Sequence, residues 1–459
     1  MGAAPTRGIE LNWLASMDWS AEEEPRSSPF AGGSDQTCES CGSVGTVTHP
    51  SAGKDAGAAL WRGVTMSSKD WTADAGRDPV LDGLRGIAIL LVLAFHFLRF
   101  DARAAWSAWA DAALRSGWIG VDLFFVLSGF LITGILIRSR AAPQRARRFY
   151  LRRALRILPA YYLVLTLTVL VIVWLVPAPE IVADSLDRLP GLLLFVQNLE
   201  SSWDGLPAVR ELGVLWSLSV EEQFYLLWPW LVWRLPVQKL AGACLHGVLL
   251  VWAIKLALYL AEAPALSLYL FTPARLDGFL LGGYLAARRQ SGQARLSPAA
   301  WAAVGLGAAL LAAVFLSRRG LSMFRSSGEL VLTTSALAVM FAGLLQASLR
   351  AAPDSWLRRG LSTPLLGWFG FYSYGLYLVH MAADTWVRLC LQPWLEPVLS
   401  ANAMALGTAG CSLLLSGFLA WLLYRLVEAP ALRLKDRFRL EPAAERLPAG
   451  NLDSVGGRR

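Results

Sequence analysis

Long apolar runs alternate with short polar connections along most of the chain. Five windows contain no Asp, Glu, Lys or Arg: residues 157–179, 296–317, 330–349, 360–383 and 397–424. Each window is long enough to cross the roughly 30 Å hydrocarbon layer of a bilayer as a helix. Segments of about ten alternating residues, which mark membrane β-strands, do not occur in the sequence. The pattern therefore predicts an all-α, polytopic membrane protein.

Less apolar runs bring the expected number of transmembrane helices to about ten. Their ranges are 81–100, 117–137, 157–177, 214–234, 240–260, 266–287, 298–317, 329–349, 363–383 and 402–427. Residues 76–434 then form one transmembrane domain, followed by a short cytoplasmic tail at 435–459. Residues 1–75 are polar and rich in Gly, Ser and acidic side chains, so we expect a disordered cytoplasmic tail. Translation from Met66 is an alternative to translation from Met1.

Composition supports the membrane class. Of the 459 residues, 55% are hydrophobic and 17% are charged, whereas a soluble domain carries about 25% charged residues. The net charge of +8 lies in loops where membrane insertion explains it, so we expect no nucleic-acid partner. Cys38 and Cys41 form a CxxC pair followed by His49, but a structural zinc site has four ligands. We therefore expect no metal.

Basic residues set the expected orientation. The connection between the second and third ranges carries eight arginines and no acid from Arg138 to Arg156. Cytoplasmic loops are enriched in Lys and Arg, which places this loop and both termini in the cytoplasm. Segment 178–213 then lies outside and has six acids against two arginines. The loop with Arg318, Arg319 and Arg325 is also placed outside and disagrees with the rule.

The first predicted span carries Arg85 and His96. Ionisable groups inside a bilayer cost at least about 2.5–3.5 kcal/mol each and mark function by default. An interval of eleven residues comes within about 20° of three full turns, so the two side chains share one helix face, about 16 Å apart along the axis. The structural alternative is an arginine that anchors the helix at the interface and a hydrogen-bonded core histidine.

Other predicted spans also carry polar groups. Glu221 and Glu222 are adjacent, and because neighbours on a helix point about 100° apart, at most one can face a given partner. Interhelical ion pairs account for Asp277 and Glu428. The further members of this set are Asp122, Arg275 and His380.

An arginine stripe leads into the third span. Arg148, Arg152 and Arg156 recur at intervals of four residues, which places them along one side of a helix. Guanidinium groups bind phosphate in a planar fork, so the stripe suits a phosphorylated ligand. Pro159 follows and is expected to kink or to begin the span. Motifs of serine hydrolases, HExxH metalloproteases, P-loop enzymes and Rossmann domains do not occur in the sequence.

The motifs taken together resemble the acyltransferase-3 family of integral-membrane acyltransferases. The matching segments are LDGLRGIAILLVLAFHF, GVDLFFVLSGFLI, RRALRILPAYY, WSLSVEEQFYLLWP, ARLDGFLLGG, YSYGLYLVH and VEAP, in the order of the family. The resemblance implies an O-acyltransferase of the bacterial inner membrane. It also implies a cytoplasmic acyl-CoA donor, usually acetyl-CoA, and a hydroxyl of a carbohydrate or glycan as acceptor.

Carried over residue by residue, the family pattern makes His96 the catalytic histidine and Arg85 its partner. It places Arg152, Arg153 and Arg156 at the acyl-CoA site. In this hypothesis His96 is the general base, and Glu222 or Glu221 orients its imidazole. The supporting or substrate-facing residues are Asp122, Arg275, Asp277, Tyr374 and His380.

Two alternatives stay open at the level of sequence. An acyltransferase acting on a small natural product, such as a macrolide, would use the same chemistry. A transporter or flippase would line its substrate path with intramembrane charges, but the repeat symmetry typical of such proteins is not visible in the sequence.

Overall fold

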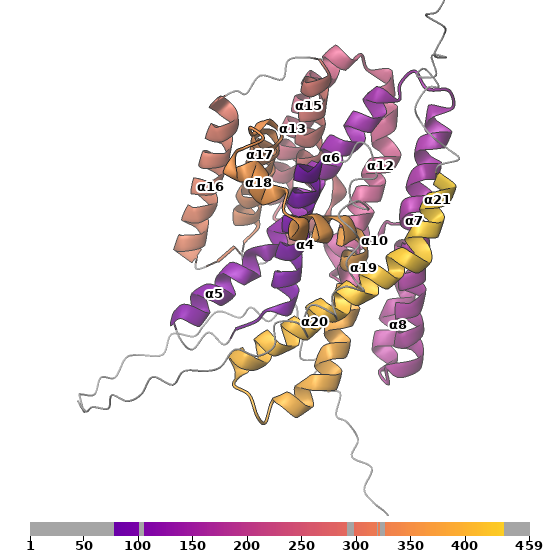
Figure 1. Cartoon of the computed structure of the whole chain (residues 1–459), viewed down its shortest axis with the longest axis vertical. Helices are drawn as coiled ribbons and strands as arrows, with labels where there is room; N and C mark the ends of the chain where they lie inside the picture. Colours follow the sequence, from indigo (N-terminus) through magenta and orange to yellow (C-terminus); the bar gives the residue numbers. More distant parts are fainter. Residues whose placement is uncertain (1–77, 101–104, 292–297, 319, 322–325, 436–459) are drawn as a thin grey trace, which may run out of the picture. The chain divides into compact units, whose positions relative to one another are not determined.

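A computed structural model describes residues 78–100, 105–291, 298–318, 320–321 and 326–435 (Figure 1). The described residues form helices joined by short connections, and no strand occurs among them. All of them belong to one compact unit, which begins at Asp78. The predicted tail at 1–75, Met66, the CxxC pair, Arg319, Arg325 and nearly all of the tail at 435–459 lie outside the described residues.

Each predicted range overlaps one long helix. These helices are α4 (Pro79–Phe97), α6 (Gly120–Arg138), α7 (Arg145–Leu175), α12 (Trp216–Arg234), α13 (Val237–Leu260), α15 (Thr272–Gln290), α16 (Pro298–Arg318), α17 (Ser327–Arg350), α19 (Pro364–Leu395) and α20 (Ala401–Leu423). The short elements are α5 (Ala105–Arg115), η1 (Ser116–Ile119), α8 (Pro179–Asp187), α9 (Leu189–Leu193), α10 (Gln197–Asp204), α11 (Arg210–Gly213), α14 (Ala265–Leu270), α18 (Trp356–Leu361), η2 (Tyr424–Glu428) and α21 (Ala429–Lys435).

Six segments of the described chain are long and apolar enough to cross a membrane. They are Pro79–Phe97, Trp106–Arg138, Arg145–Leu175, Val237–Leu260, Ser327–Arg350 and Ala401–Leu434. These apolar helices support an integral membrane protein. Helices α12, α15, α16 and α19 do not meet the same criterion, so a total of about ten crossings stays a prediction.

Two helices are longer than the sequence indicates. Helix α7 begins at Arg145 and runs through Pro159 without ending, so the arginine stripe and the apolar span form one continuous helix. A proline inside a membrane helix is tolerated where neighbouring groups satisfy the freed carbonyl. Helix α19 continues to Leu395, beyond the predicted end at residue 383. This extension places Asp384 and Arg388 on the same helix as His380.

Helices α4 and α19 pack backbone against backbone because glycines line their contact. A Cβ atom added at Gly86 would lie 2.2 Å from the Leu366 carbonyl oxygen, and one at Gly370 would lie 1.9 Å from that of Asp82. Small residues allow such approach between membrane helices. The close contact brings side chains of the two helices together along their length.

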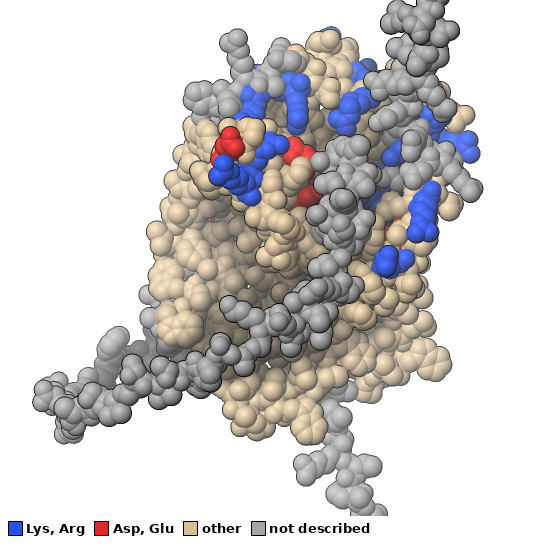
Figure 2. All heavy atoms as spheres, in the orientation of Figure 1, with Lys and Arg blue, Asp and Glu red and all other residues tan. Residues whose placement is uncertain are grey.

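Basic side chains gather at one end of the bundle, here called the basic end. Arg140, between α6 and α7, donates to the carbonyls of Val232 and Leu235 at the end of α12. Arg358 of α18 lies 3.9 Å from Asp78 at the start of α4. On the face drawn in Figure 2, Lys and Arg lie in the upper part of the molecule. We call the opposite end the far end.

Candidate active site

The predicted histidines His96 and His380 face one another across the α4–α19 contact. Nδ1 of His96 lies 3.3 Å from Nε2 of His380, and the ring centroids are 4.8 Å apart. His96 occupies the last turn of α4, and His380 lies in the middle of α19. His380 is fully buried, whereas His96 keeps 8% of its surface exposed.

Backbone carbonyls fix which nitrogens of this pair carry hydrogen. Nδ1 of His380 lies 2.7 Å from the Tyr377 carbonyl oxygen, and Nδ1 of His96 lies 2.9 Å from that of Val92. A carbonyl oxygen only accepts, so each Nδ1 is the donor of its neutral ring. Nε2 of His380 then accepts the Nδ1 hydrogen of His96. The carbonyl oxygen of Val92 accepts the same hydrogen. Nε2 of His96 carries a lone pair and has no hydrogen-bond partner within the described parts of the chain.

A polar stripe on α19 continues from His380 toward the far end. Asp384 and Arg388 follow at intervals of four residues, so all three share one side of the helix. The carboxylate of Asp384 accepts from Arg388 at 2.8 Å and from Ser412 of α20 at 2.9 Å. Arg388 also donates to the carbonyl of Phe97, next to His96, at 2.8 Å. The stripe ties the end of α4 to α19 and α20.

Arg210, at the start of α11, lies beside this stripe. It is close enough to interact electrostatically with Asp384 and Glu211. Burial lowers the pKa of Arg210 below its ordinary value despite these two carboxylates. Arg210 and Arg99 both act electrostatically on His96. The histidine pair is thus close to charges of both signs, two arginines and the carboxylate of Asp384.

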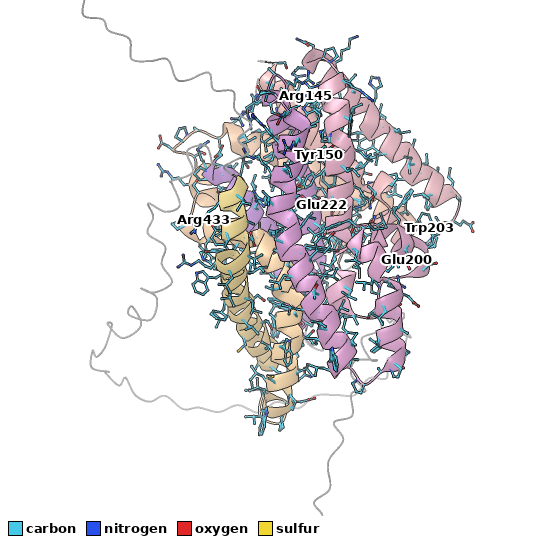
Figure 3. All side chains as sticks on the ribbon, turned by 90° about the vertical axis from the view of Figure 1, so that its right-hand side faces the viewer. Arg145, Tyr150, Glu200, Trp203, Glu222 and Arg433 are labelled. Atoms are coloured by element: carbon cyan, nitrogen blue, oxygen red, sulfur yellow. The ribbon has the colours of Figure 1, made fainter. Side chains whose placement is uncertain are left out.

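The two adjacent glutamates lie apart from His96. Glu221 accepts hydrogen bonds from the hydroxyls of Ser128 and Tyr225. Glu222, seen in Figure 3 beside α7 and below Arg145, interacts electrostatically with Arg153. The expected contact between either glutamate and His96 does not occur in the described structure. The polar side chain that contacts the imidazole is that of His380, because α4 packs closely on α19.

The arginines of α7 that were expected at the donor site point into the bundle at two levels. Arg153 lies over the ring of Tyr225, with its guanidinium carbon 5.0 Å from the centroid. Arg156 and Arg85 are both near Glu428 in η2, which supports the ion-pair role expected for that glutamate. Arg152, their neighbour on α7, is half-buried. Arg85 and His96 lie on α4, as predicted.

Tyr374 has a structural contact. Its hydroxyl donates to the carbonyl of Ile157 at 2.7 Å and joins α19 to α7 just before Pro159. This bond holds α19 against α7 directly after Arg156 in the sequence.

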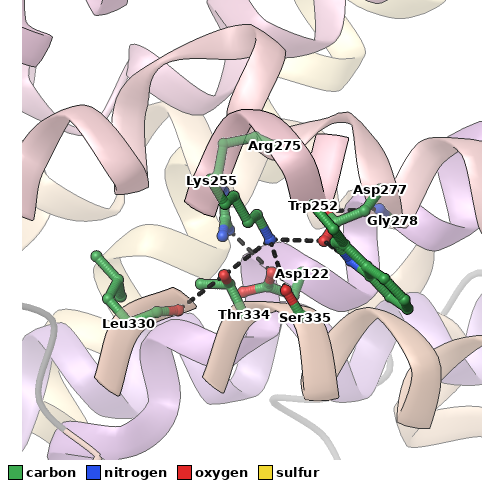
Figure 4. Close-up of polar contacts among 9 residues, drawn as sticks. All are labelled: Asp122, Trp252, Lys255, Arg275, Asp277, Gly278, Leu330, Thr334 and Ser335. Carbon is green, nitrogen blue, oxygen red and sulfur yellow. Dashed lines mark hydrogen bonds and ion pairs between the residues drawn. The ribbon is translucent and has the colours of Figure 1, made fainter. Parts of the chain in front are cut away.

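Asp122, Arg275 and Asp277 belong to a buried charge network (Figure 4). Arg275 donates to Asp122 at 2.9 Å, and Lys255 of α13 donates to Asp277 at 2.6 Å and to Thr334 of α17 at 2.9 Å. The ion pair expected for Asp277 is thus present, and it links α13 with α15. Four helices, α6, α13, α15 and α17, meet at this network.

Aromatic rings complete the surroundings of Arg275. Its guanidinium carbon lies 4.9 Å from the Tyr269 ring centroid, 5.5 Å from that of Phe125 and 5.9 Å from that of Trp216. Such contacts stabilise a desolvated guanidinium. Arg275 is 1% exposed. In the described structure its side chain therefore packs against these rings, away from solvent.

Four residues of these clusters were not anticipated from the sequence: Lys255, Asp384, Arg388 and Arg210. Lys255 interrupts the apolar run LLVWAIKLALYL, and a lone lysine inside a predicted span is a signal for a buried acidic partner. Asp384 and Arg388 are separated by four residues, the spacing of a helical ion pair. Because the ninth span was predicted to end at residue 383, the two residues were not assigned to the same helix.

The geometry allows proton transfer at one atom, Nε2 of His96, which has no hydrogen-bond partner among the described residues. A neutral imidazole whose Nδ1 hydrogen is held by two acceptors presents Nε2 as a base toward a substrate. Within the described residues, no group of three or more His, Cys, Asp and Glu side chains could hold a metal ion.

Comparisons with known proteins agree with these motifs. A family model described as an acyltransferase domain, acyltransferase-3, matches residues 78–425. The peptidoglycan O-acetyltransferase OatA of Listeria monocytogenes is 30% identical over 374 residues, which cover 77% of this chain and 55% of that protein. YrhL of Bacillus subtilis, to which peptidoglycan O-acetylation is provisionally ascribed, is 32% identical over 66% of this chain and 48% of its own.

The O-acetyltransferase OatA of Staphylococcus aureus is 31% identical over 45% of this chain and 34% of its own. The chain thus spans about half the length, or less, of these curated relatives. No solved structure matches it. The family match covers the helices that carry His96, Arg153, Glu222, Arg275 and His380. The chain therefore belongs to the acyltransferase-3 family.

Proposed function

We propose that this protein is a membrane O-acetyltransferase that transfers an acetyl group from acetyl-CoA to a hydroxyl of a glycan acceptor. The observation that carries the proposal is the pair His96–His380, in which Nε2 of His96 is the atom left to act as a base. The names of the relatives, which are O-acetyltransferases, support acetyl as the group and a glycan as the acceptor.

The proposed orientation places the basic end in the cytoplasm of a bacterial cell, with about ten helices crossing the inner membrane. The positive-inside rule supports this assignment, because Arg140, Arg145 and Arg234 gather where α6, α7 and α12 meet. Both termini of the membrane domain then face the cytoplasm. His96 follows Arg85 by eleven residues on α4, so it lies farther from the cytoplasmic side of the membrane.

The donor site follows from the charges of α7. Arg152, Arg153 and Arg156 would bind the phosphates of coenzyme A, since guanidinium groups form paired hydrogen bonds with phosphate oxygens. Arg153 and Arg156 already face Glu222 and Glu428. Bound phosphates would compete with these carboxylates, so donor binding would reorganise the ion pairs near the basic end.

The reaction is a direct transfer. Nε2 of His96 removes the proton from the acceptor hydroxyl, and the oxygen attacks the carbonyl carbon of the thioester. The new ester C–O bond forms, the C–S bond breaks, and the imidazolium returns its proton to the thiolate of coenzyme A. His380 orients His96 by accepting its Nδ1 hydrogen. Glu221 and Glu222 act at the donor side in this proposal, rather than as orienting groups for His96.

The experiment uses the full chain, purified and reconstituted in proteoliposomes. Radiolabelled acetyl-CoA and a glycan oligosaccharide are supplied, and the product is analysed by mass spectrometry for ester-linked acetate. We expect acetyl ester on the oligosaccharide together with free coenzyme A. Acetylation of a macrolide but not of any glycan would overturn the acceptor assignment. Movement of the oligosaccharide across the bilayer without ester formation would overturn the enzyme assignment in favour of a transporter.

A further inference from the structure

Five helices, α4, α6, α12, α7 and α19, contact one another in a ring. Helix α4 packs on α6 and on α19, and α6 packs on α12. Tyr374 joins α19 to α7 by its bond to the Ile157 carbonyl at 2.7 Å. Tyr150 of α7 donates to the Leu226 carbonyl of α12 at 2.8 Å, which closes the ring. Side chains on the inner sides of these helices therefore face one another and not lipid.

One side of α6 is only half-buried, although the rest of that helix is buried up to its last residue. The members of this side follow one another at intervals of three or four residues and are Phe124, Ser128, Leu131 and Ile135. The opposite side packs on α15, where a Cβ atom added at Gly282 would lie 2.1 Å from the Val126 carbonyl oxygen. Ser128 is hydrogen-bonded to Glu221 of α12, so the half-buried side faces into the ring. Accessible surface therefore follows the inside of α6 to the basic end, where Arg138 is exposed.

A stripe of polar side chains on α12 lies along the same interior. Its members recur at intervals of four residues, share one side of the helix and are Ser217, Glu221 and Tyr225. At one end Ser217 lies 2.5 Å from the Tyr377 hydroxyl, and the Tyr377 carbonyl binds Nδ1 of His380. At the other end Tyr225 lies under the guanidinium of Arg153. The stripe, about 12 Å long, thus leads from the histidine pair to the proposed donor site.

Glu221 is the middle member of this stripe and is half-buried. Its Oε1 accepts hydrogen bonds from the hydroxyls of Ser128 and Tyr225. Its Oε2 accepts no hydrogen bond from any residue that the structure describes. A carboxylate inside a membrane protein is costly unless donors surround it. The geometry therefore leaves Oε2 for a hydrogen-bond donor on a bound molecule.

The proposed acyl-CoA donor has to pass this oxygen. Its phosphates at Arg153 and its thioester at His96 lie at the two ends of the stripe, so the pantetheine arm between them runs along α12. The arm carries secondary amides, and an amide N–H without an acceptor in an apolar interior costs binding energy. A carboxylate oxygen accepts from such an N–H in a charge-assisted hydrogen bond.

We propose that Glu221 is a donor-binding residue, whose Oε2 accepts a hydrogen bond from an amide N–H of the pantetheine arm. This bond sets the depth at which the thioester meets His96. Ser128 and Tyr225 are positioning residues, because they hold Oε1 and so orient Oε2. The inference rests on the proposed function, since it deepens the recognition of the same donor.

The test compares acetyl-CoA with two analogues on the reconstituted full chain. In each analogue a different amide of the pantetheine arm is replaced by an ester, which removes the N–H and keeps nearly the same shape. We expect one of the analogues to have a kcat/KM about tenfold or more below that of acetyl-CoA. This is the size of effect typical of a hydrogen bond to a charged group.

Glu221→Gln separates this contact from packing. The amide oxygen of glutamine still accepts from Ser128 and Tyr225, but an NH2 group, which only donates, takes the place of Oε2. The variant should use acetyl-CoA and the sensitive analogue about equally well, because such non-additivity marks a direct contact. Its affinity for 3′-phospho-ADP, which carries the phosphates of coenzyme A without the arm, should stay unchanged and verifies that the variant is folded.

Glu200→Gln is the matched control. Glu200 is exposed on α10, away from the stripe on α12 (Figure 3). The same change of a carboxylate to an amide at this position should keep the full preference for acetyl-CoA over the sensitive analogue.

The failures of the two proposals give different results. Equal kcat/KM for acetyl-CoA and both analogues in the unchanged protein would overturn the role of Glu221 and leave the acetyltransferase assignment intact. A preference that Glu221→Gln keeps in full would do the same. The absence of transfer to any acceptor would overturn the proposed function. In that case calorimetric titration with coenzyme A and its ester analogues still judges the contact, because equal affinities, or no binding at all, would contradict it.

Discussion

Nδ1 of His96 and Nε2 of His380 lie 3.3 Å apart although 284 residues separate them in the chain. The contact depends on the close approach of α4 and α19, which Gly86 and Gly370 permit. His380 in turn donates to the Tyr377 carbonyl, so its Nε2 accepts. One helix contact thus sets both the position and the tautomer of the proposed base.

The orienting role of His380 can be tested by two substitutions. His380→Leu removes the acceptor for Nδ1 of His96 and should lower kcat about tenfold or more, a part of the 10²–10⁴ that a general base contributes. His380→Gln offers an amide oxygen and should recover part of the loss. The KM for acetyl-CoA should stay unchanged in steady-state assays. Equal activity of His380→Leu and the unchanged protein would contradict the role.

Packing of α4 on α19 should be sensitive to a single methyl group at Gly370. In Gly370→Ala the new Cβ would meet the Asp82 carbonyl oxygen at 1.9 Å, and such overpacking costs about 1–3 kcal/mol. Thermal unfolding in detergent should show the loss together with reduced acetyl transfer.

Gly360→Ala in α18 is the matched control, because a Cβ at that glycine meets no atom within 4 Å. Its stability should change by less than about 0.5 kcal/mol. A similar loss in both variants would show that the effect reflects glycine replacement in general and not the α4–α19 contact.

The buried pair Lys255–Asp277 gives a prediction for stability. Lys255→Met leaves the Asp277 carboxylate buried without its cation and should cost about 3–5 kcal/mol in the free energy of unfolding. Adding Asp277→Asn removes the orphaned charge and should restore much of the loss. Denaturant titration of the two variants measures the difference, and an additive loss in the double variant would disagree with the ion pair.

The proposed donor site predicts a change in binding when charge is reversed on α7. Arg153→Glu and Arg156→Glu should raise the KM for acetyl-CoA more than they lower kcat, because each replaces a phosphate-binding cation by a repelling anion. Arg359→Glu, at an exposed arginine paired only with Asp354 among the described residues, is the charge-matched control. Unchanged affinity of the α7 variants for acetyl-CoA would contradict the donor site. It would mean that these arginines serve only to set the membrane orientation.

Helix positions were largely predictable from the sequence because apolar length and polar breaks mark them directly. The motif around Arg85 and His96 also indicated which helix carries the proposed base. The small residues Gly83 and Gly86 in the first span are typical of tight helix contacts, but they do not identify α18 and α19 as the neighbours.

The arrangement of side chains between helices was less predictable. Glu222 suited His96 as a partner by charge alone, yet helix packing gives that position to His380. Lys255 interrupts an apolar run, and the sequence does not show that Asp277 lies beside it. Contacts of this kind depend on which helix faces meet, and periodicity within one helix does not contain that information.

The most direct test of the account replaces His96 itself. His96→Ala and His96→Gln are reconstituted at equal amounts with the unchanged protein, and transfer of radiolabelled acetate from acetyl-CoA to the glycan is measured after binding of acetyl-CoA has been verified. The account predicts that both variants bind acetyl-CoA normally and form ester at a rate at least about 10² lower, since the base is missing. Ester formation at the unchanged rate by His96→Ala would contradict it.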